Sequence, residues 1–543
     1  MIFFHPKILD AFEGYSHSLF AKDVVAGITV GIVALPLAMA FAIASGLKPE
    51  AGIFTAIVAG GLISLLGGSR VQIGGPAGAF IVIVYGIVER YGIPNLLLAT
   101  AMSGVLLFLM GMFRLGTLVR FIPIAVIIGF TNGIACLIGL SQIKDFFGLT
   151  IEKMPAHFFP MIQALYAAAD TVNIAALSLA SASLMMIVVW KWIQKKLAWL
   201  NYLPGTVVAM VTATVMTGIF NLPVDTIGSR FGGIPSSLPS FEWIPISWGT
   251  AQYMVTPALT LALLGAIECL LCARVADGLI HDRHDSNQEL MAQGVANLVG
   301  PFFGGMPATG TIARTVTNIE SGGSTPIAGI VHALTLLLVV LFAAPLAKDI
   351  PLACLAAILM YVAWNMGEWR KFVDLKQFRL PYQFTILSVF LLTVILDLTI
   401  AVQVGLLFAF ITFIYRISSL SRCEAADLEH YPALENHQGQ IDAYRIYGAI
   451  FFGAVKLLEK IEQKLPSQTL LIDLKNVIYI DTSGMEAITE LAYLCKIRNI
   501  KLIICGLDHQ PYEMAQRSGY LQTLEADCLY PDLATGIAAI THS

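Results

Sequence analysis

Long apolar stretches alternate with short polar segments over the first four-fifths of the chain. Eleven clearly apolar stretches lie between Val24 and Ile414, and three shorter or interrupted ones lie among them at 77–88, 292–303 and 308–319. A membrane-spanning helix needs about 20 consecutive apolar residues, and several of these stretches reach or approach that length. The pattern predicts about fourteen transmembrane segments, of which the three short ones are too short for a simple span.

The positions of the basic residues support this count. If the N-terminus is cytoplasmic, 16 Lys and Arg residues fall on inner segments and 6 on outer ones. Cytoplasmic loops of membrane proteins carry the excess of positive charge, and an odd number of crossings would remove the bias. We therefore expect fourteen crossings with both termini in the cytoplasm. Residues 1–22 show no signal-peptide pattern and are expected to form a cytoplasmic segment.

The character of the sequence changes after Arg422. Thr469–Asp473 and Lys501–Cys505 are short apolar strands, and Gly484–Arg498 and Asp508–Ser518 have the spacing of amphipathic helices. Strands that alternate with helices predict a mixed sheet covered by helices. We expect a transmembrane domain over 23–420, a polar linker over 421–440 and a soluble α/β domain over 441–543.

Two stretches rich in Gly and Pro interrupt the apolar pattern at matching places, at 67–78 and 304–315. Each is the third segment of a set of seven, and each leads into a short helix. Because seven is odd, the second set enters the membrane from the opposite face, which predicts an inverted repeat. Interrupted segments at matching places in two halves mark the binding site of many transporters. The alternative is that the glycines only allow close helix packing.

An interrupted helix near the middle of a membrane exposes backbone N–H groups, and its N-terminus carries about half a positive charge. Two such ends that face each other can bind an anion. Arg314 would add a full positive charge there. We predict that a small anion binds at Gly75, Pro76, Ala77, Gly78, Ala79, Thr309, Gly310, Thr311, Ile312, Ala313 and Arg314.

Glu268 lies in the middle of an apolar stretch. A carboxylate is costly there unless it is paired or protonated, and such residues often carry coupling ions. We predict that Glu268 is a proton-coupling site. The alternatives are a neutral packing hydrogen bond, or an ion pair with Arg314 that only joins two helices. Asp23 and Asp277 are expected at the membrane interface, and His332 is expected to be a packing residue.

Composition narrows the class of protein. Hydrophobic residues make up 57% of the chain and charged residues 13%, against about 25% charged in soluble domains, and the net charge is -4. These values exclude a disordered chain, a nucleic-acid binder and an ordinary soluble enzyme. There is no P-loop, nucleophile elbow or metal-spaced cluster, so no enzyme activity, cofactor or metal is expected. The single C-x-x-C, Cys269 to Cys272, lies in an apolar helix, which disfavours redox or metal chemistry.

Four motifs resemble those of the SulP family of anion transporters, which includes sulfate permeases and bicarbonate transporters. They are the run Asp23–Pro36, the break Gly74–Pro76, the segment Gly129–Gly133 and the helix around Glu268. The C-terminal domain resembles the STAS domain of that family. The resemblance implies a polytopic α-helical protein with a seven-plus-seven inverted repeat divided into core and gate domains. It also implies an anion bound between the third and tenth helices, an elevator-like movement and a homodimer in the bacterial inner membrane.

Within the family, further stretches are similar to the C4-dicarboxylate transporters of enteric bacteria, which implies proton-coupled uptake of succinate or fumarate. These stretches are Leu264–Cys272, Pro301–Gly305, Ile312–Arg314 and Val362–Met366. Sodium-coupled bicarbonate members carry Asp in place of Glu268 and Thr in place of Cys272 and Ile312. Sodium prefers oxygen ligands, so the resemblance favours protons over sodium. A sulfate or bicarbonate permease or an anion exchanger of the same fold is the alternative.

The STAS-like domain differs from the anti-sigma-factor antagonists at one position. Those proteins carry a phosphorylated serine after the aspartate that ends a strand, whereas here Asp481 is followed by Thr482 and Ser483. A phosphate at Thr482 would be a charge switch at a helix N-terminus, and the alternative is that Thr482 and Ser483 only cap the helix. We expect a cytoplasmic protein partner to bind this domain. A membrane receptor that signals through the domain is the alternative function from a different class.

Overall fold

The computed structural model describes residues 4–11, 15–117, 123–152, 154–194, 196, 204–245, 247–396, 398–427, 430–437, 439–452, 456–524 and 528–541. The chain divides into two compact units, Met1–Leu406 and Leu407–Ser543, and each is described by itself.

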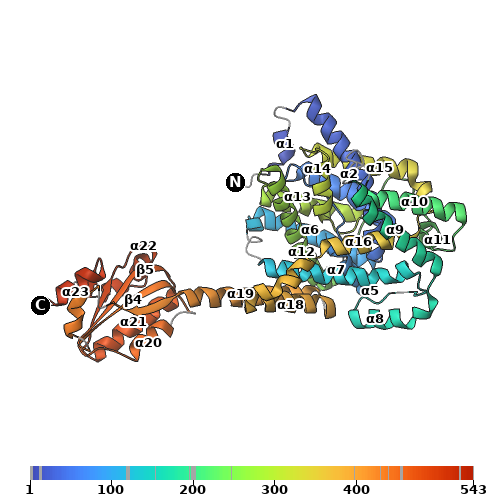
Figure 1. Ribbon diagram of the computed structural model, residues 1–543. Coiled ribbons are helices and arrows are strands. Elements are labelled where there is room, and N and C mark those ends of the chain that lie inside the picture. The colour runs from blue at the N-terminus through green and yellow to red at the C-terminus, as the bar shows by residue number, and fades with distance from the viewer. Residues whose placement is uncertain are drawn as a thin grey trace. The chain divides into compact units, whose positions relative to one another are not determined.

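The first unit is helical, and all fourteen predicted segments contain a helix (Figure 1). Among the described residues, eight helices are long and apolar enough to cross a membrane, or nine if the bent pair α16 and α17 is one span. The first seven segments are α2 (His17–Ala44), α3 to α4 (Pro49–Phe54, Gly60–Leu66), α5 (Ile81–Tyr91), α6 (Ile93–Met112), α7 (Ile124–Phe147), α9 (Ile174–Gln194) and α10 (Gly205–Phe220). The second seven are α12 (Trp248–Ile280), α13 (Ser286–Val299), α14 (Ile312–Glu320), α15 (Ile327–Ala347), α16 (Leu352–Met366), α18 (Leu380–Ile395) and α19 (Leu398–Leu420).

Shorter elements connect these helices. They are α1 (Lys7–Ala11), the π-helical turn η1 (Thr55–Ala59), the 3-10 turn η2 (Gly78–Phe80), α8 (Phe158–Ala167), α11 (Ile227–Phe231) and α17 (Trp369–Val373). Two-residue strands β1 (Gly74–Gly75) and β2 (Thr309–Gly310) precede η2 and α14 and form an antiparallel pair.

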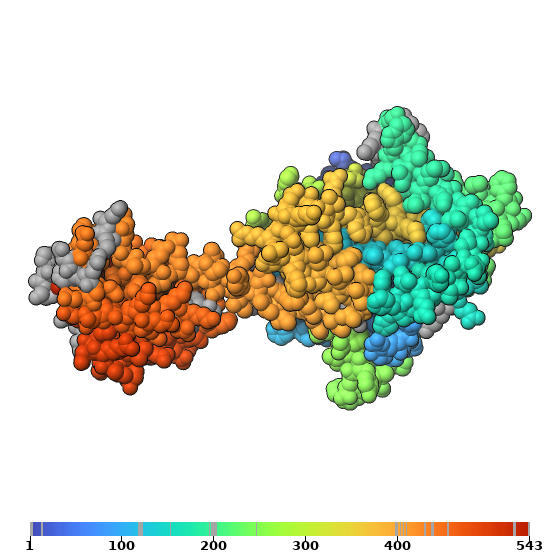
Figure 2. Space-filling view, turned by 60° about the horizontal axis from the view of Figure 1, so that its bottom comes forward, coloured from blue at the N-terminus to red at the C-terminus, as the bar shows by residue number. Residues whose placement is uncertain are grey.

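Helix packing follows the predicted inverted repeat. Helix α4 packs on α15 as its counterpart α13 packs on α6, and α2 packs on α15 as α12 packs on α6. In the same way, α7 packs on α18 and α16 packs on α9. The helices therefore form two groups, a core that contains the two broken segments and a gate that contains α7, α9, α10, α16 and α18. Figure 2 shows gate helices of both halves lying side by side on one face of this unit.

Asp23, which was expected at the membrane interface near a helix end, lies in the second turn of α2 with its side chain fully buried within the protein. Its carboxylate accepts hydrogen bonds from Tyr15 Oη (2.8 Å) and from the backbone N–H of Ser324 (2.8 Å), as well as from Thr325 Oγ1 (2.5 Å). Burial and the bond to Asp23 raise the pKa of Tyr15 to about 12, so the phenol remains a donor at neutral pH. Asp23 thus joins the beginning of α2 to the beginning of α15.

The second unit contains a five-stranded sheet in the order β3-β4-β5-β6-β7, antiparallel between β3 and β4 and parallel elsewhere. The strands are β3 (Arg422–Ala425), β4 (Ile441–Ile450), β5 (Thr469–Ile480), β6 (Lys501–Cys505) and β7 (Leu529–Tyr530), and the helices are α20 (Lys456–Glu462), α21 (Thr482–Ile497), α22 (His509–Arg517) and α23 (Leu533–Thr541). Apolar residues are buried on both faces of the sheet.

The segment 421–440, expected as a linker, is part of this folded unit. Strand β3 pairs along β4 from Arg422 opposite Tyr447 to Ala425 opposite Tyr444. Further along, Leu434 is 4% exposed and packs with Leu471 and Ile503 of the sheet. Because most residues of the segment are polar, the sequence predicted a linker, although a few apolar residues pack against the sheet.

Candidate anion-binding site

The two broken segments cross at the β1–β2 pair, where Gly74 lies opposite Gly310 and Gly75 lies opposite Thr309. Beyond the pair, α14 binds the backbone of the first segment. Both N–H and Oγ1 of Thr311 donate to the carbonyl of Ile73, each at 2.9 Å, and Thr315 Oγ1 accepts from Ile73 N–H at 3.0 Å. The second half of the chain therefore fixes the position of the first broken segment.

The second broken segment is held by polar side chains of α13. The side chain of Asn297 makes two hydrogen bonds with the backbone of Ala308. It donates to the carbonyl at 2.8 Å and accepts from the N–H at 2.7 Å. Gln293 Nε2 donates to the same carbonyl at 3.1 Å. From the first half, Thr55 Oγ1 accepts from Met306 N–H at 2.7 Å. These bonds satisfy extended backbone that has no helical partners of its own.

Neither helix that follows the pair has a side-chain cap. The N-cap residue of η2 is Ala77, and the N-cap residue of α14 is Thr311, whose hydroxyl is used by Ile73 instead. Ala77, Gly78 and Ala79 are buried, whereas Ala313 on the first turn of α14 is exposed. The structure therefore brings the predicted anion-binding residues of both halves to one crossing, with two helix N-termini whose first N–H groups no side chain caps.

Arg314 lies behind this crossing and is only 1% exposed. Its Nη1 and Nη2 have no hydrogen-bond partner among the described residues. A Cβ atom on Gly75 would lie 2.3 Å from Nη1, and the positive φ of Gly75 (+155°) also favours glycine there. A buried guanidinium without a partner is costly unless an anion neutralises it. The ion pair with Glu268 that the sequence left open is not formed.

Glu268 is half-buried on α12 and makes no hydrogen bond or ion pair with any residue that the structure describes. The two cysteines beside it serve as hydrogen-bonding groups for the broken segments. Cys269 Sγ accepts from Gln72 Nε2 at 3.1 Å, and Cys272 Sγ donates to Thr315 Oγ1 at 3.3 Å. The C-x-x-C motif therefore joins α12 to both broken segments.

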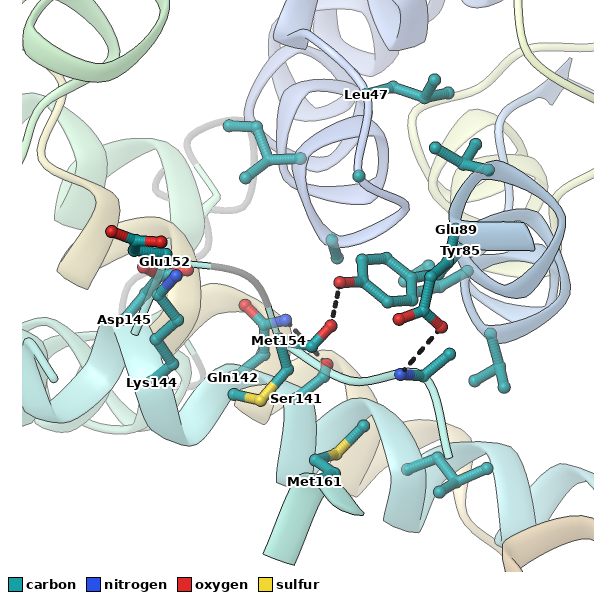
Figure 3. Close-up of a pocket in the computed structure, with 18 of the residues that line it drawn as sticks. Leu47, Tyr85, Glu89, Ser141, Gln142, Lys144, Asp145, Glu152, Met154 and Met161 are labelled. Atoms are coloured by element: carbon teal, nitrogen blue, oxygen red, sulfur yellow. Dashed lines mark hydrogen bonds between the residues drawn. The ribbon is translucent and has the colours of Figure 1, made fainter. Parts of the chain in front are cut away.

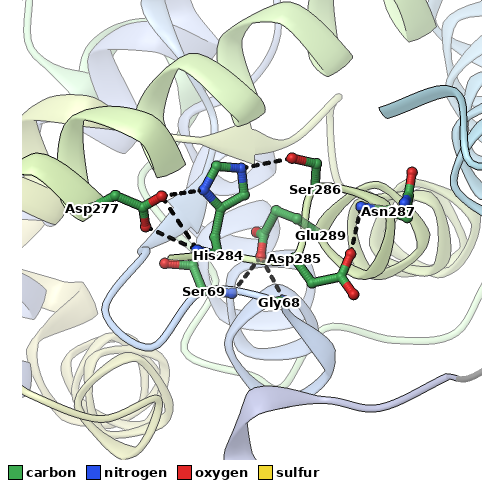
Figure 4. Close-up of polar contacts among 8 residues, drawn as sticks. All are labelled: Gly68, Ser69, Asp277, His284, Asp285, Ser286, Asn287 and Glu289. Atoms are coloured by element: carbon green, nitrogen blue, oxygen red, sulfur yellow. Dashed lines mark hydrogen bonds and ion pairs between the residues drawn. The ribbon is translucent and has the colours of Figure 1, made fainter. Parts of the chain in front are cut away.

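Glu289 is a second buried carboxylate in this region, and it was not predicted from the sequence. It is 1% exposed, and its Oε2 accepts from the backbone N–H groups of Gly68 (2.7 Å) and Ser69 (2.9 Å), where the first helix breaks (Figure 4). The apolar pattern placed the beginning of this segment at residue 292, but α13 begins at Ser286 because Asp285 caps it. An Asp N-cap followed by a Glu in the first turn was the available signal.

Asp277, His284 and Ser286 form a chain of side chains at the turn between α12 and α13 (Figure 4). His284 Nδ1 lies 2.7 Å from Asp277 Oδ2, and His284 Nε2 lies 2.9 Å from Ser286 Oγ. The spacing is that of a hydrolytic triad. However, the N–H groups of the next two residues, which could form an oxyanion hole, both donate to Asp285 Oδ1 (2.9 and 3.1 Å). The network stabilises the turn and cannot stabilise an oxyanion.

A cavity of about 470 Å³ opens between α2 and α5 of the core and α7 of the gate (Figure 3). Ala156 N–H donates to Glu89 Oε2 at 3.2 Å, and Tyr85 Oη donates to the carbonyl of Met154, so α5 is bonded to the segment after α7. The cavity is lined by three acidic and two basic side chains, of which Arg230 pairs with Asp145 at 2.7 Å. This charge balance does not favour an anion.

In the second unit, the residue that caps the helix after β5 differs from the caps expected from the sequence. Asp481 is the N-cap of α21, and its Oδ1 accepts from Gly484 N–H at 2.8 Å. The suggestion that Thr482 and Ser483 cap the helix is therefore wrong. Thr482 is the first helical residue and is exposed, while Ser483 is half-buried.

Comparisons with known proteins agree with this geometry. The sulfate permease family model matches residues 20–389, and the STAS domain model matches residues 431–535. The putative sulfate transporter YvdB of Bacillus subtilis is 42% identical over 520 residues, which cover 94% of this chain and 95% of that protein. The bicarbonate transporter BicA of Picosynechococcus is 28% identical and covers 95% of this chain and 96% of its own length. These relatives do not support the closer resemblance to the C4-dicarboxylate transporters.

Two solved structures share the fold. The transmembrane domain of a cyanobacterial bicarbonate transporter BicA aligns with a TM-score of 0.63 at 29% identity, over 72% of this chain and 98% of that one. Murine Slc26a9 in the inward-facing state aligns with a TM-score of 0.87 over 99% of this chain and 94% of that one, and at 18% identity it shows the fold alone. The chain therefore belongs to the sulfate permease (SulP) family and is a multi-pass membrane protein with a C-terminal STAS domain.

Proposed function

We propose that this chain is a secondary transporter that carries a small dianion together with protons, with the anion bound between the N-termini of η2 and α14. The observation that carries the proposal is Arg314, a buried guanidinium without a protein partner beside two uncapped helix ends. One full charge and two helix N-termini supply about two positive charges in sum. That sum matches a dianion better than a monoanion.

The substrate proposed from the sequence is a C4-dicarboxylate such as succinate or fumarate. Sulfate, which the name of the Bacillus relative specifies, is also a dianion and fits the same charge. Bicarbonate, the substrate in the name of BicA, carries one charge and is the weaker candidate on this argument. Uptake of a C4-dicarboxylate, of sulfate and of bicarbonate should therefore be compared in the same assay.

Glu268 is the proposed proton-coupling site. Its carboxylate has no partner among the described residues, and the neighbouring Cys269 and Cys272 bond to both broken segments. Protonation of Glu268 would change the charge on α12, one of the helices that hold the anion site. This arrangement supports coupling between a proton and the anion.

The division of the helices into core and gate supports an elevator-like movement, in which the core carries the anion past the gate. We propose this mechanism for a homodimer in the bacterial inner membrane, with both termini cytoplasmic. Exposed Thr482 is the proposed phosphorylation site of the STAS domain. Uptake by Thr482→Glu should differ from uptake by Thr482→Ala, which cannot be phosphorylated, and mass spectrometry of the protein purified from its host should find the phosphate.

The proposal is tested with full-length protein in liposomes. Uptake of labelled sulfate, fumarate and bicarbonate is measured with an inward proton gradient, with a sodium gradient and with no gradient. Proton-driven uptake of sulfate or fumarate supports the proposal. Arg314→Ala should abolish that uptake, and Arg274→Ala, which removes an exposed arginine of α12, should not. Binding without uptake would instead indicate a receptor, and uptake driven only by sodium would overturn the proton coupling.

A further inference from the structure

Three buried polar side chains lie behind β1 without protein partners. Ser64, Arg314 and His332 are 3%, 1% and 0% exposed. Within the described part of the chain, Ser64 Oγ, both terminal nitrogens of Arg314 and both ring nitrogens of His332 lack a hydrogen-bond partner. We call these three side chains the polar file.

The polar file follows one face of η1 and α4. Ala56, Gly60 and Ser64 are four residues apart, so they lie on the same side of these helices at steps of about 6 Å. A Cβ atom on Gly75 would lie 2.3 Å from Arg314 Nη1 and 3.7 Å from the Cα of Ala56. Arg314 is therefore at the level of Ala56, beside the β1–β2 crossing.

His332 lies at the level of Gly60, and the side chain of Ser64 lies one turn further along α4. A Cβ atom on Gly60 would lie 2.7 Å from the carbonyl oxygen of Gly74 and 3.8 Å from His332 Cε1. A Cβ atom on Gly329, one turn before His332 on α15, would lie 2.0 Å from Ser64 Oγ. The polar groups thus run in the order Arg314, His332 and Ser64, away from the anion site and towards the end of α4.

Few other charged groups face His332. Elements η1 and α4 carry no titratable side chain. On α2 the titratable residues are His17, Lys22 and Asp23, all in its first two turns, and Asp23 binds residues that precede α15. The remaining charged group is Arg314 of the polar file itself, one step away along η1 and α4.

Buried polar groups in proteins are normally hydrogen-bonded, and water supplies the bonds that the chain does not. A neutral imidazole has one donor and one acceptor nitrogen, so it can take a proton at one nitrogen and release the other. Neither ring nitrogen of His332 has a hydrogen-bond partner of ordinary geometry among the described residues, and the backbone of Gly329, one turn earlier on α15, is a polar group that acts on it. The ring can therefore complete this exchange.

We propose that the polar file is a hydrated proton path and that His332 is its proton-carrying group. A hydronium ion donates a proton to the acceptor nitrogen and becomes water, the ring becomes imidazolium, and the proton on the other nitrogen passes to a water near Ser64, which becomes hydronium. No oxidant or other reactant is needed. This inference deepens the proposed function, since it supplies the coupled proton with a route between the anion site and the cytoplasm, and it rests on that function.

The test measures protons and anions in the same liposomes. Full-length protein is reconstituted with pyranine inside, and labelled sulfate and fumarate are the probes. His332→Gln should lower the number of protons moved per anion at least tenfold while anion uptake remains within about threefold of wild type. Ser64→Ala should lower the ratio by a smaller factor. The controls are Thr335→Val on the same helix and Ser103→Ala, whose hydroxyls bond to backbone carbonyls at 2.8 and 2.7 Å and which should leave the ratio unchanged.

The outcomes separate the inference from the proposed function. If wild-type protein moves neither probe, the proposed dianion transport fails. If wild type moves anions with protons and His332→Gln keeps the wild-type ratio, the proton path is wrong although transport stands. If His332→Gln does not fold, a high-resolution structure of the wild type decides, because ordered water between His332 and Ser64 is expected and a dry, closed contact would overturn the path.

Discussion

The two broken segments occupy equivalent places in the inverted repeat, but only the second places a charged side chain, Arg314, against the β1–β2 pair, whereas Arg70 of the first pairs with Asp282. The β1–β2 register makes Gly75 equivalent to Gly310, so Ala79 is the counterpart of Arg314. Each half also extends one long polar side chain across the crossing, since Arg314 lies against Gly75 and Gln72 lies against Gly310. The first of these side chains is unpartnered at its Nη atoms, while Gln72 donates to Cys269. The same geometry thus leaves a side chain without a protein partner in one half and bonds the corresponding side chain to α12 in the other, which is the contrast that the proposed function predicts for binding and support.

The largest effect on anion affinity should come from removing the positive charge of Arg314. Arg314→Ala should weaken sulfate or fumarate binding about 100-fold, because hydrogen bonds to a buried charged group are worth up to about 3 kcal/mol. Since Arg314 has no protein partner, the thermal stability of the anion-free protein should not fall. Equilibrium binding and thermal unfolding of purified protein measure both quantities.

Arg314→Lys sharpens this prediction. It keeps the charge but loses the fork of donors, so it should recover part of the affinity. If Arg314→Ala binds as tightly as wild type, the difference between the two helix ends has no role in binding.

The two equivalent glycines offer the next test. Gly75→Ala would place a methyl group 2.3 Å from Arg314 Nη1, and it should displace the guanidinium and weaken anion binding about tenfold. Gly310→Ala would place a methyl group 1.8 Å from Gln72 Nε2, and it should cost about 1–3 kcal/mol of stability by overpacking, with a smaller effect on affinity. Comparing the affinity and the unfolding temperature of the two variants checks the contrast. Equal losses of affinity would show that the crossing acts as one rigid unit.

Glu268→Gln should change pH dependence more than rate. In wild type, uptake should fall as pH rises, because the proton is a co-substrate that becomes scarce. The neutral amide cannot release a proton, so uptake by Glu268→Gln should vary less than about twofold between pH 5.5 and 8, with Glu320→Gln on the exposed end of α14 as the control. A wild-type pH profile in Glu268→Gln would assign the coupling to another group.

The positions of the breaks could be predicted from sequence because Gly and Pro interrupt an apolar pattern. The contacts across the crossing could not, since Gln72 and Cys269, or Thr311 and Ile73, are about 200 residues apart or more and meet only in the packed core. Polar residues also caused the bounds of two elements, α13 and β5, to be predicted too short. Residues 286–289 are polar but helical, and because Lys475 and Asn476 are polar, only the first part of β5 was predicted as a strand.

The smallest effect on stability and affinity should come from removing the hydroxyl of Thr311, the N-cap residue of α14. Thr311 occupies the place of Pro76 in the other half, and its hydroxyl bonds to the carbonyl of Ile73. Thr311→Val keeps the shape and removes that bond, but the same carbonyl still accepts from the backbone N–H of residue 311 at 2.9 Å. The loss should therefore be at most about 1 kcal/mol of stability, with affinity within about threefold of wild type. A large loss of affinity would mean that the threonine hydroxyl contacts the anion, and then the two helix ends differ in donors as well as in charge.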